Sequence, residues 1–190
     1  EAMVLVEQAL RQAQSDDIAE DASLFNFVPH LTASRGCMQA ILAADASPSI
    51  PALTESISTW ETILKSCNTK ADIYKRVDDP DGLLDHLQSM SQLVGLRGEN
   101  SLQLTISQLL VSVSRIFAGH GQTTSTALIV RQSQLASQLI SFGSYARALA
   151  TLEQAKTQIE EIGELPPSVT IAYNLSQAEY WAGVGSIDDA

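Results

Sequence analysis

Aromatic residues are scarce in this sequence, and their scarcity points away from β-rich folds. Phe, Trp and Tyr make up only 5% of the 190 residues, and the 45% that is hydrophobic is mostly Leu, Ile, Val and Ala. Such residues suit helix-on-helix packing better than a β-sandwich. No Asn-Gly or Asp-Gly hairpin turn joins two strand-like runs. We therefore expect an all-α fold.

Cysteine is nearly absent, which argues against a secreted disulfide scaffold. The chain has two cysteines, Cys37 and Cys67, and both lie inside apolar helical patterns. We expect buried thiols in an intracellular protein of the cytoplasm or nucleus. There is no run of about 18 apolar residues to span a membrane, and we expect no signal peptide. We expect no membrane partner.

Basic residues are outnumbered two to one. The chain has 11 Lys and Arg against 22 Asp and Glu, a formal net charge of −11. Such a surface repels phosphate backbones, so nucleic acid is not an expected partner. The basic residues at 65, 70, 75 and 76 are followed at once by acidic residues at 78, 79 and 81. We interpret this segment as a solvated helix end.

Histidine is also rare, and no residue pattern predicts a metal or cofactor. His30, His86 and His120 lie far apart, and none has a metal-ligand spacing to Cys, Asp or Glu. His30 and His86 fall in helical patterns, where surface or capping roles are expected. No phosphate loop, dinucleotide fingerprint or nucleophile elbow is present. We expect no cofactor, no metal and no small-molecule substrate.

His120 is a separate case because it stands between Gly119 and Gly121. Such a corner can present an imidazole to a cysteine nucleophile. Cys37 and Cys67, however, lack the Gly- and Ser-rich setting of a catalytic corner. We expect an inter-helix loop and a chain that is not an enzyme. Catalysis by His120 with either cysteine is the alternative hypothesis.

Hydrophobic periodicity predicts eight helices and leaves residues 68–81 unassigned. The predicted helices cover about 2–14, 29–45, 51–66, 82–96, 100–117, 124–142 and 145–162, and a last helix runs from Pro166-Pro167 to about 183. The last helix carries Ile171, Leu175, Ala178 and Trp181. We expect an N-terminal helical part, 1–80, and helical repeats over 81–190, which together form one continuous solenoid.

A glycine corner recurs along the chain. Gly143-Ser144-Tyr145-Ala146-Arg147-Ala148 reappears as Gly185-Ser186-Ile187-Asp188-Asp189-Ala190, a spacing of 42 residues from 143 to 185. Gly98 stands 45 residues before Gly143. Periods of this size are typical of helical-repeat arrays. We expect a piece of a longer protein in which the stack of helices continues past the second corner.

The segment around the first corner resembles the tetratricopeptide repeat. Leu135-Ala136 matches its Leu-Gly pair, Leu139 its aromatic position, Gly143 and Tyr145 its turn, and three residues its second helix, Ala148, Leu152 and Ala155. Gln132 stands where the pattern prefers Trp, and Glu160 where it prefers Pro. The resemblance implies stacked antiparallel helix pairs, a tetratricopeptide-like α-solenoid. A chance helical bundle is the alternative.

Three longer stretches resemble the helical arm of separase, the cohesin-cleaving protease, in its fungal forms. They are Leu83–Gly98 leading into Leu102–Arg115, Gln134–Leu149, and Ile171–Trp181 before Gly185. The resemblance implies an interior segment of that arm, which acts in sister-chromatid separation by holding a securin-like inhibitor, other domains of the same chain or substrate. The family's catalytic corner is also Gly-His-Gly. Because no matching cysteine corner is present, we do not transfer that role to His120.

The sequence therefore predicts a non-catalytic scaffold or protein-binding segment. The acidic balance favours a basic or mixed-charge peptide. Polar residues on the first helix of each pair face either a binding groove or solvent: Gln134, Ser137, Gln138, Asn174 and Gln177. The alternative function is a tetratricopeptide-like adaptor module of an unrelated intracellular protein.

Overall fold

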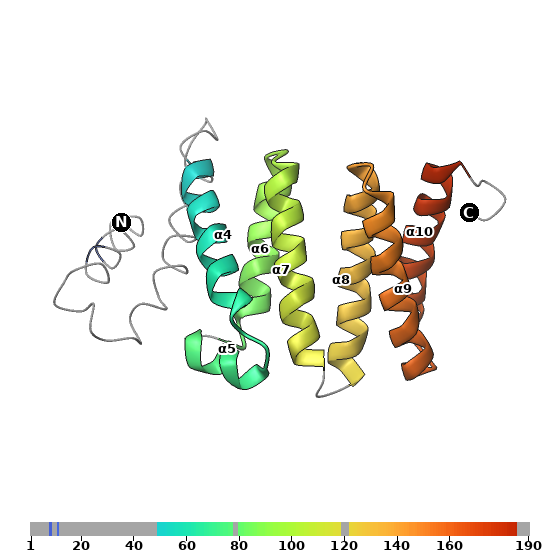
Figure 1. Cartoon of the computed structure of the whole chain (residues 1–190), viewed down its shortest axis with the longest axis horizontal. Coiled ribbons are helices and arrows are strands. Elements are labelled where there is room, and N and C mark those ends of the chain that lie inside the picture. The colour runs from blue at the N-terminus through green and yellow to red at the C-terminus, as the bar shows by residue number, and fades with distance from the viewer. Residues whose placement is uncertain (1–7, 9–10, 12–48, 78–79, 119–121, 186–190) are drawn as a thin grey trace. The chain divides into compact units, whose positions relative to one another are not determined.

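A computed structural model describes residues 8, 11, 49–77, 80–118 and 122–185. These residues form helices and connecting turns, and they contain no strand, which confirms the prediction of an all-α fold. The helices labelled in Figure 1 are α4 (Ser49–Lys65), α5 (Lys70–Arg76), α6 (Leu83–Leu96), α7 (Asn100–Ala118), α8 (Gln122–Ser141), α9 (Tyr145–Ile162) and α10 (Pro167–Val184).

The helices predicted from residue 51 onward are confirmed, with ends that differ by no more than two residues. The helices predicted at 2–14 and 29–45 fall outside the described residues, apart from Gln8 and Arg11, which are helical. The segment without a prediction, 68–81, contains the short helix α5.

Helix α5 begins at a reciprocal cap. The backbone N–H of Asp72 donates to the Thr69 hydroxyl (3.2 Å), and the Asp72 carboxylate accepts from the backbone N–H of Thr69 (2.8 Å). These bonds satisfy two N–H groups that the first turn leaves without helical partners. The Thr69 hydroxyl, followed by the backbone N–H groups of Asn68 and Thr69, lowers the pKa of Asp72 below its ordinary 3.8.

The chain divides into two compact units, residues 1–106 and 107–190. The boundary expected between residues 80 and 81 stays a prediction, as does the continuity of the whole chain as one solenoid.

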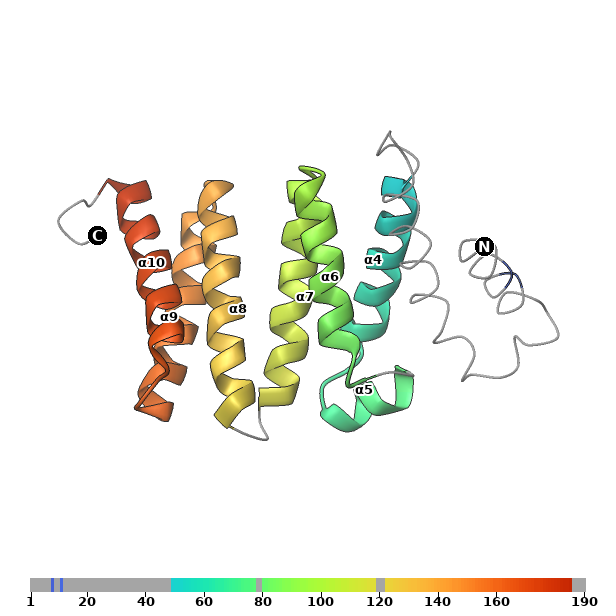
Figure 2. The ribbon, with the colours of Figure 1, turned by 180° about the vertical axis from the view of Figure 1, so that it is seen from behind.

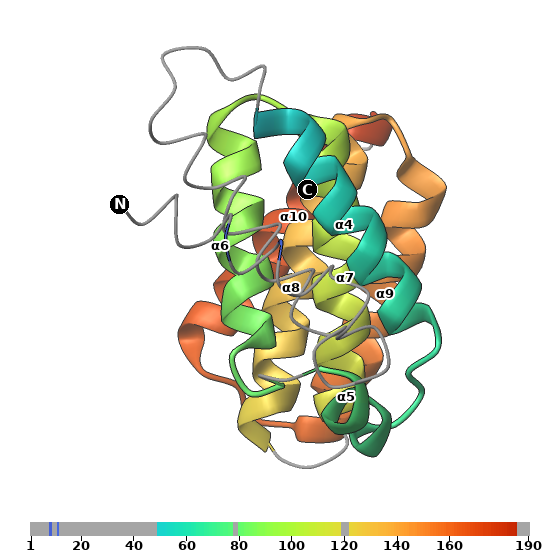
Figure 3. The same cartoon turned by 90° about the vertical axis from the view of Figure 1, so that its left-hand side faces the viewer.

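The described core of the first unit lies between α4 and α6, with the short α5 at one end of α4 (Figure 3). Trp60 of α4 is fully buried, and its ring lies 6.2 Å from that of His86 on α6. Further fully buried side chains of this unit include Leu53 of α4, Ile73 of α5 and four residues of α6, Leu83, Leu87, Met90 and Val94. They follow the helical spacing from which α4 and α6 were predicted.

In the second unit, α8, α9 and α10 pack side by side (Figures 1 and 2). Helix α8 ends at Gly143, whose φ of 68° is easily reached only by glycine. The Gly143 N–H donates to the carbonyl of Ile140, and the Ser144 N–H donates to the carbonyl of Leu139, each at 2.8 Å. This pair of bonds is the Schellman motif. It turns the chain back so that α9 runs antiparallel to α8.

Helix α7 is long and apolar enough, by length and composition alone, to cross a membrane. Its side chains are nevertheless sorted by face. Ile106, Leu110 and Val113 are buried, whereas Ser112 and Arg115 are exposed. This pattern is typical of a core helix with one solvated side. The expectation of no membrane partner stays a prediction.

Candidate functional site

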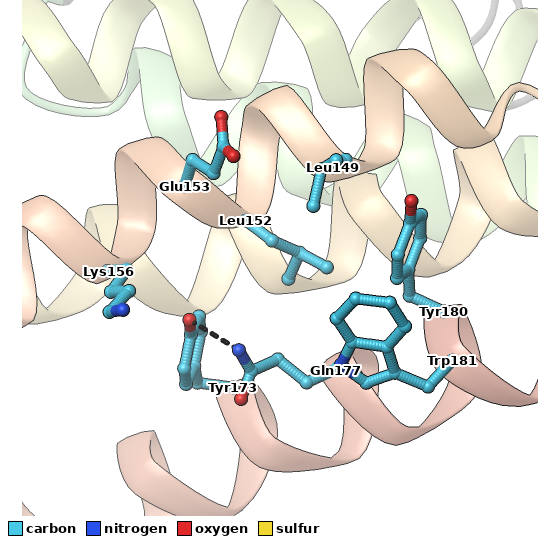
Figure 4. Close-up of a pocket in the computed structure, with 8 residues that line it drawn as sticks. All are labelled: Leu149, Leu152, Glu153, Lys156, Tyr173, Gln177, Tyr180 and Trp181. Carbon is cyan, nitrogen blue, oxygen red and sulfur yellow. Dashed lines mark hydrogen bonds between the residues drawn. The ribbon is translucent and has the colours of Figure 1, made fainter. Parts of the chain in front are cut away.

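A groove runs between α9 and α10 in the second unit (Figure 4). Its first part has a volume of about 180 Å³. Helix α9 lines it with Leu149, Leu152, Glu153 and Lys156. The floor from α9 is therefore apolar, and a carboxylate and an ammonium group stand at its rim.

Helix α10 supplies the opposite wall of this groove. Tyr173, Gln177, Tyr180 and Trp181 line it, and Figure 4 shows them facing the α9 side chains. A second hollow of about 580 Å³ shares Lys156, Tyr173 and Gln177 with the first. It adds residues from both helices and from the turn between them: Ile159, Glu160, Gly163, Leu165, Thr170 and Asn174. We call the two hollows together the α9–α10 groove.

Aromatic side chains fix the wall formed by α10. The amide nitrogen Nε2 of Gln177 donates to the Tyr173 hydroxyl at 2.9 Å. Tyr180 and Trp181 meet edge to face, with ring centroids 5.0 Å apart. Burial raises the pKa of Tyr173 above its ordinary value, and the nearby Glu160 carboxylate raises it further. The hydroxyl of Tyr173 therefore stays protonated at neutral pH and can act as a donor.

Small residues bring the three helices close together. Ala148 and Ala155 of α9 and Ala136 of α8 are fully buried, and alanine allows neighbouring helices to approach closely. At the other end, a Cβ on Gly183 would lie only 2.7 Å from Cε1 of Tyr145. A glycine at position 183 thus lets the start of α9 lie against the end of α10.

Serine side chains join α10 to α8. The Ser176 hydroxyl lies 3.0 Å from the carbonyl oxygen of Ser133 and 3.1 Å from the Ser137 hydroxyl. Tyr173 and Tyr180, three and four residues from Ser176, lie on the same buried face of α10, and they also line the groove beside α9. The same helix face thereby builds both the contact with α8 and the wall of the groove.

Helix α9 also reaches back to α7. The Arg115 guanidinium donates to the Gln154 side-chain oxygen at 2.7 Å. Arg131 of α8 donates to the Ser114 hydroxyl of α7, also at 2.7 Å. Helix α9 therefore contacts α7 and α8, and α10 contacts α8 and α9. In this part of the chain α10 packs on the two helices before it, whereas α9 packs on α8 and is bonded to α7 through Arg115 and Gln154.

The five polar residues expected at a groove or in solvent take different places. Asn174 and Gln177 line the α9–α10 groove, whereas Gln134 is exposed elsewhere on α8. Ser137 and Gln138 are half-buried, and Ser137 bonds to α10. Because all five residues are polar, the sequence alone did not show which of them would line the groove, face solvent or contact α10.

Helix α10 also departs from the burial that its sequence pattern suggests. Ile171 and Leu175 are two of the apolar residues from which this helix was predicted, yet they are 66% and 59% exposed. The residues that α10 buries are Val169, Tyr173, Ser176 and Tyr180. Their spacing of four, three and four residues would have indicated this face, but the serine within it hid the pattern.

Of the cysteines and histidines considered as possible catalytic or metal-binding residues, Cys67 and His86 lie in the segments that the structure describes. Cys67 is buried, and its thiol lies 3.4 Å from the carbonyl oxygen of Ile63. Burial raises the pKa of this thiol, against a smaller lowering by Arg76. A protonated, buried thiol is a poor nucleophile. His86 is half-buried beside Trp60, and His30, Cys37 and His120 lie outside the described residues.

Within the described segments, no three His, Cys, Asp or Glu side chains gather as metal ligands would. At the rim of the groove, Lys156 and Glu160 form an ion pair, with Nζ and Oε1 4.0 Å apart. Both side chains are about two-thirds exposed. An exposed pair of this kind contributes little stability. The chemistry that this groove offers is apolar contact, aromatic edges and hydrogen bonds.

Comparison with protein-family models, with curated proteins and with solved structures gives no match for this chain.

Proposed function

We propose that this chain is a non-catalytic, protein-binding segment of an α-solenoid with tetratricopeptide-like helix pairs. Helices α8 and α9 form one pair, and α10 is the first helix of the next. The observation that carries the proposal is the packing of α9 on α8 and of α10 on both α8 and α9, together with the hydrogen bond from Arg115 of α7 to Gln154 of α9. Such repetition is how helical-repeat proteins bury the apolar faces of their units.

Burial at the positions that match the repeat pattern supports this assignment. Ala136, Ala148 and Ala155 are fully buried, and the larger residues of the pattern are buried with them, Leu135, Leu139 and Leu152. Gln132, which stands at the Trp position, is also fully buried. The small residues thus lie where close helix contact needs them. A chance bundle would not need glycine corners 42 residues apart, at 143 and 185.

The α9–α10 groove supports a role in binding protein segments. It combines an apolar floor with a donor, Tyr173, and with rim carboxylates, Glu153 and Glu160. Partner surfaces are commonly anchored by aromatic residues and oriented by a polar rim. With a net charge of −11, the chain favours basic or mixed-charge partners.

In its specific form, the proposal is an interior segment of the helical arm of a separase-like protease in the cytoplasm or nucleus. The partners would be a securin-like inhibitor or other domains of the same chain, with the catalytic domain elsewhere. The support is the resemblance of three helical stretches, whose residues Leu83, Leu87 and Leu135 are buried packing positions. An adaptor module of an unrelated intracellular protein would use the same surfaces.

A fluorescence-anisotropy titration of labelled securin with the purified chain tests this form. We expect saturable binding that weakens as salt is raised, because the chain is strongly acidic. A scrambled peptide of the same composition is the control. If circular dichroism shows a folded helical chain and no binding occurs up to high micromolar concentration, the separase-like form is wrong.

A further inference from the structure

We draw no further inference here: the strongest candidate, the α9–α10 groove together with the exposed Ile171 and Leu175 of α10, belongs to the surface from which the function is proposed, and nothing in the structure shows what covers it.

Discussion

Gln132 is the residue whose surroundings fit its chemistry least well. It is fully buried in α8, and neither atom of its side-chain amide has a hydrogen-bond partner among the described residues. A buried amide without partners costs about 1–3 kcal/mol of stability. The tetratricopeptide pattern that this segment resembles has an apolar aromatic residue here, and an apolar side chain would not carry the cost of an unpaired amide.

We therefore expect Gln132→Leu to raise the free energy of unfolding by about 1–2 kcal/mol, measured by urea denaturation. Gln134→Leu, on the exposed side of the same helix, is the control and should change stability by less than about 0.5 kcal/mol. A clear loss of stability in Q132L would mean that the amide has a partner and stabilises the fold.

Asp72 gives a prediction for pH. Its pKa lies below 3.8 because the Thr69 hydroxyl and two backbone N–H groups bond to the charged form. The folded-state pKa is lower than the unfolded-state value. The stabilisation is therefore complete above the unfolded-state pKa and is lost as pH falls through the folded-state pKa.

We expect Thr69→Ala to raise the pKa of Asp72 towards its ordinary value, and Thr69→Ser, which keeps the hydroxyl, to leave it low. Carboxyl ¹³C shifts followed as a function of pH measure both. An unchanged pKa in T69A would show that the backbone bonds alone hold it down.

At the scale of the helices, the close approach of α9 to α8 depends on alanine. Ala155 is fully buried, whereas Ala150 of the same helix is exposed. A larger side chain at a packed position forces neighbouring side chains and backbone apart, at a cost of typically 1–3 kcal/mol.

Ala155→Leu should accordingly lower the free energy of unfolding by about 1–3 kcal/mol, whereas Ala150→Leu should leave it nearly unchanged. Parallel urea titrations compare the two variants. Equal effects would argue against tight packing between these helices.

The helices themselves were predictable because their apolar residues recur at helical spacing and glycine marks their ends. Gly143 is an example, since its positive φ closes α8 where the pattern stops. Helix α5 was missed because only one of its side chains, Ile73, is buried and its start depends on a side-chain cap. Local bonding, not periodicity, defines that helix.

The groove could not be predicted because it depends on which neighbours cover a helix. Ile171 and Leu175 have the spacing of a core face but are exposed, and Ser176 is buried because it bonds to α8. The polarity of a residue does not show whether another helix covers it. The repeat of the glycine corner was the one signal, since it related the positions of α10 to those of α8.

At the scale of the whole molecule, we propose a repeated arrangement of helix pairs, of which the packing of α10 on α8 and α9 is the described example. The 22 acidic residues keep the surface of such an array negative and favour partners of opposite charge. The position of α10 on α8 is the step by which one helix pair leads to the next.

A cysteine pair tests that step most directly. The hydroxyls of Ser137 and Ser176 lie 3.1 Å apart, so Ser137→Cys with Ser176→Cys, in a chain whose native cysteines are replaced by alanine, should form a disulfide under mild oxidation. Peptide mapping by mass spectrometry detects it. The control pair, Gln134→Cys with Ser176→Cys, should stay reduced because Gln134 lies on another side of α8. A chain that stays reduced at 137 and 176, or cross-links equally in both pairs, would contradict the proposed stacking of helices.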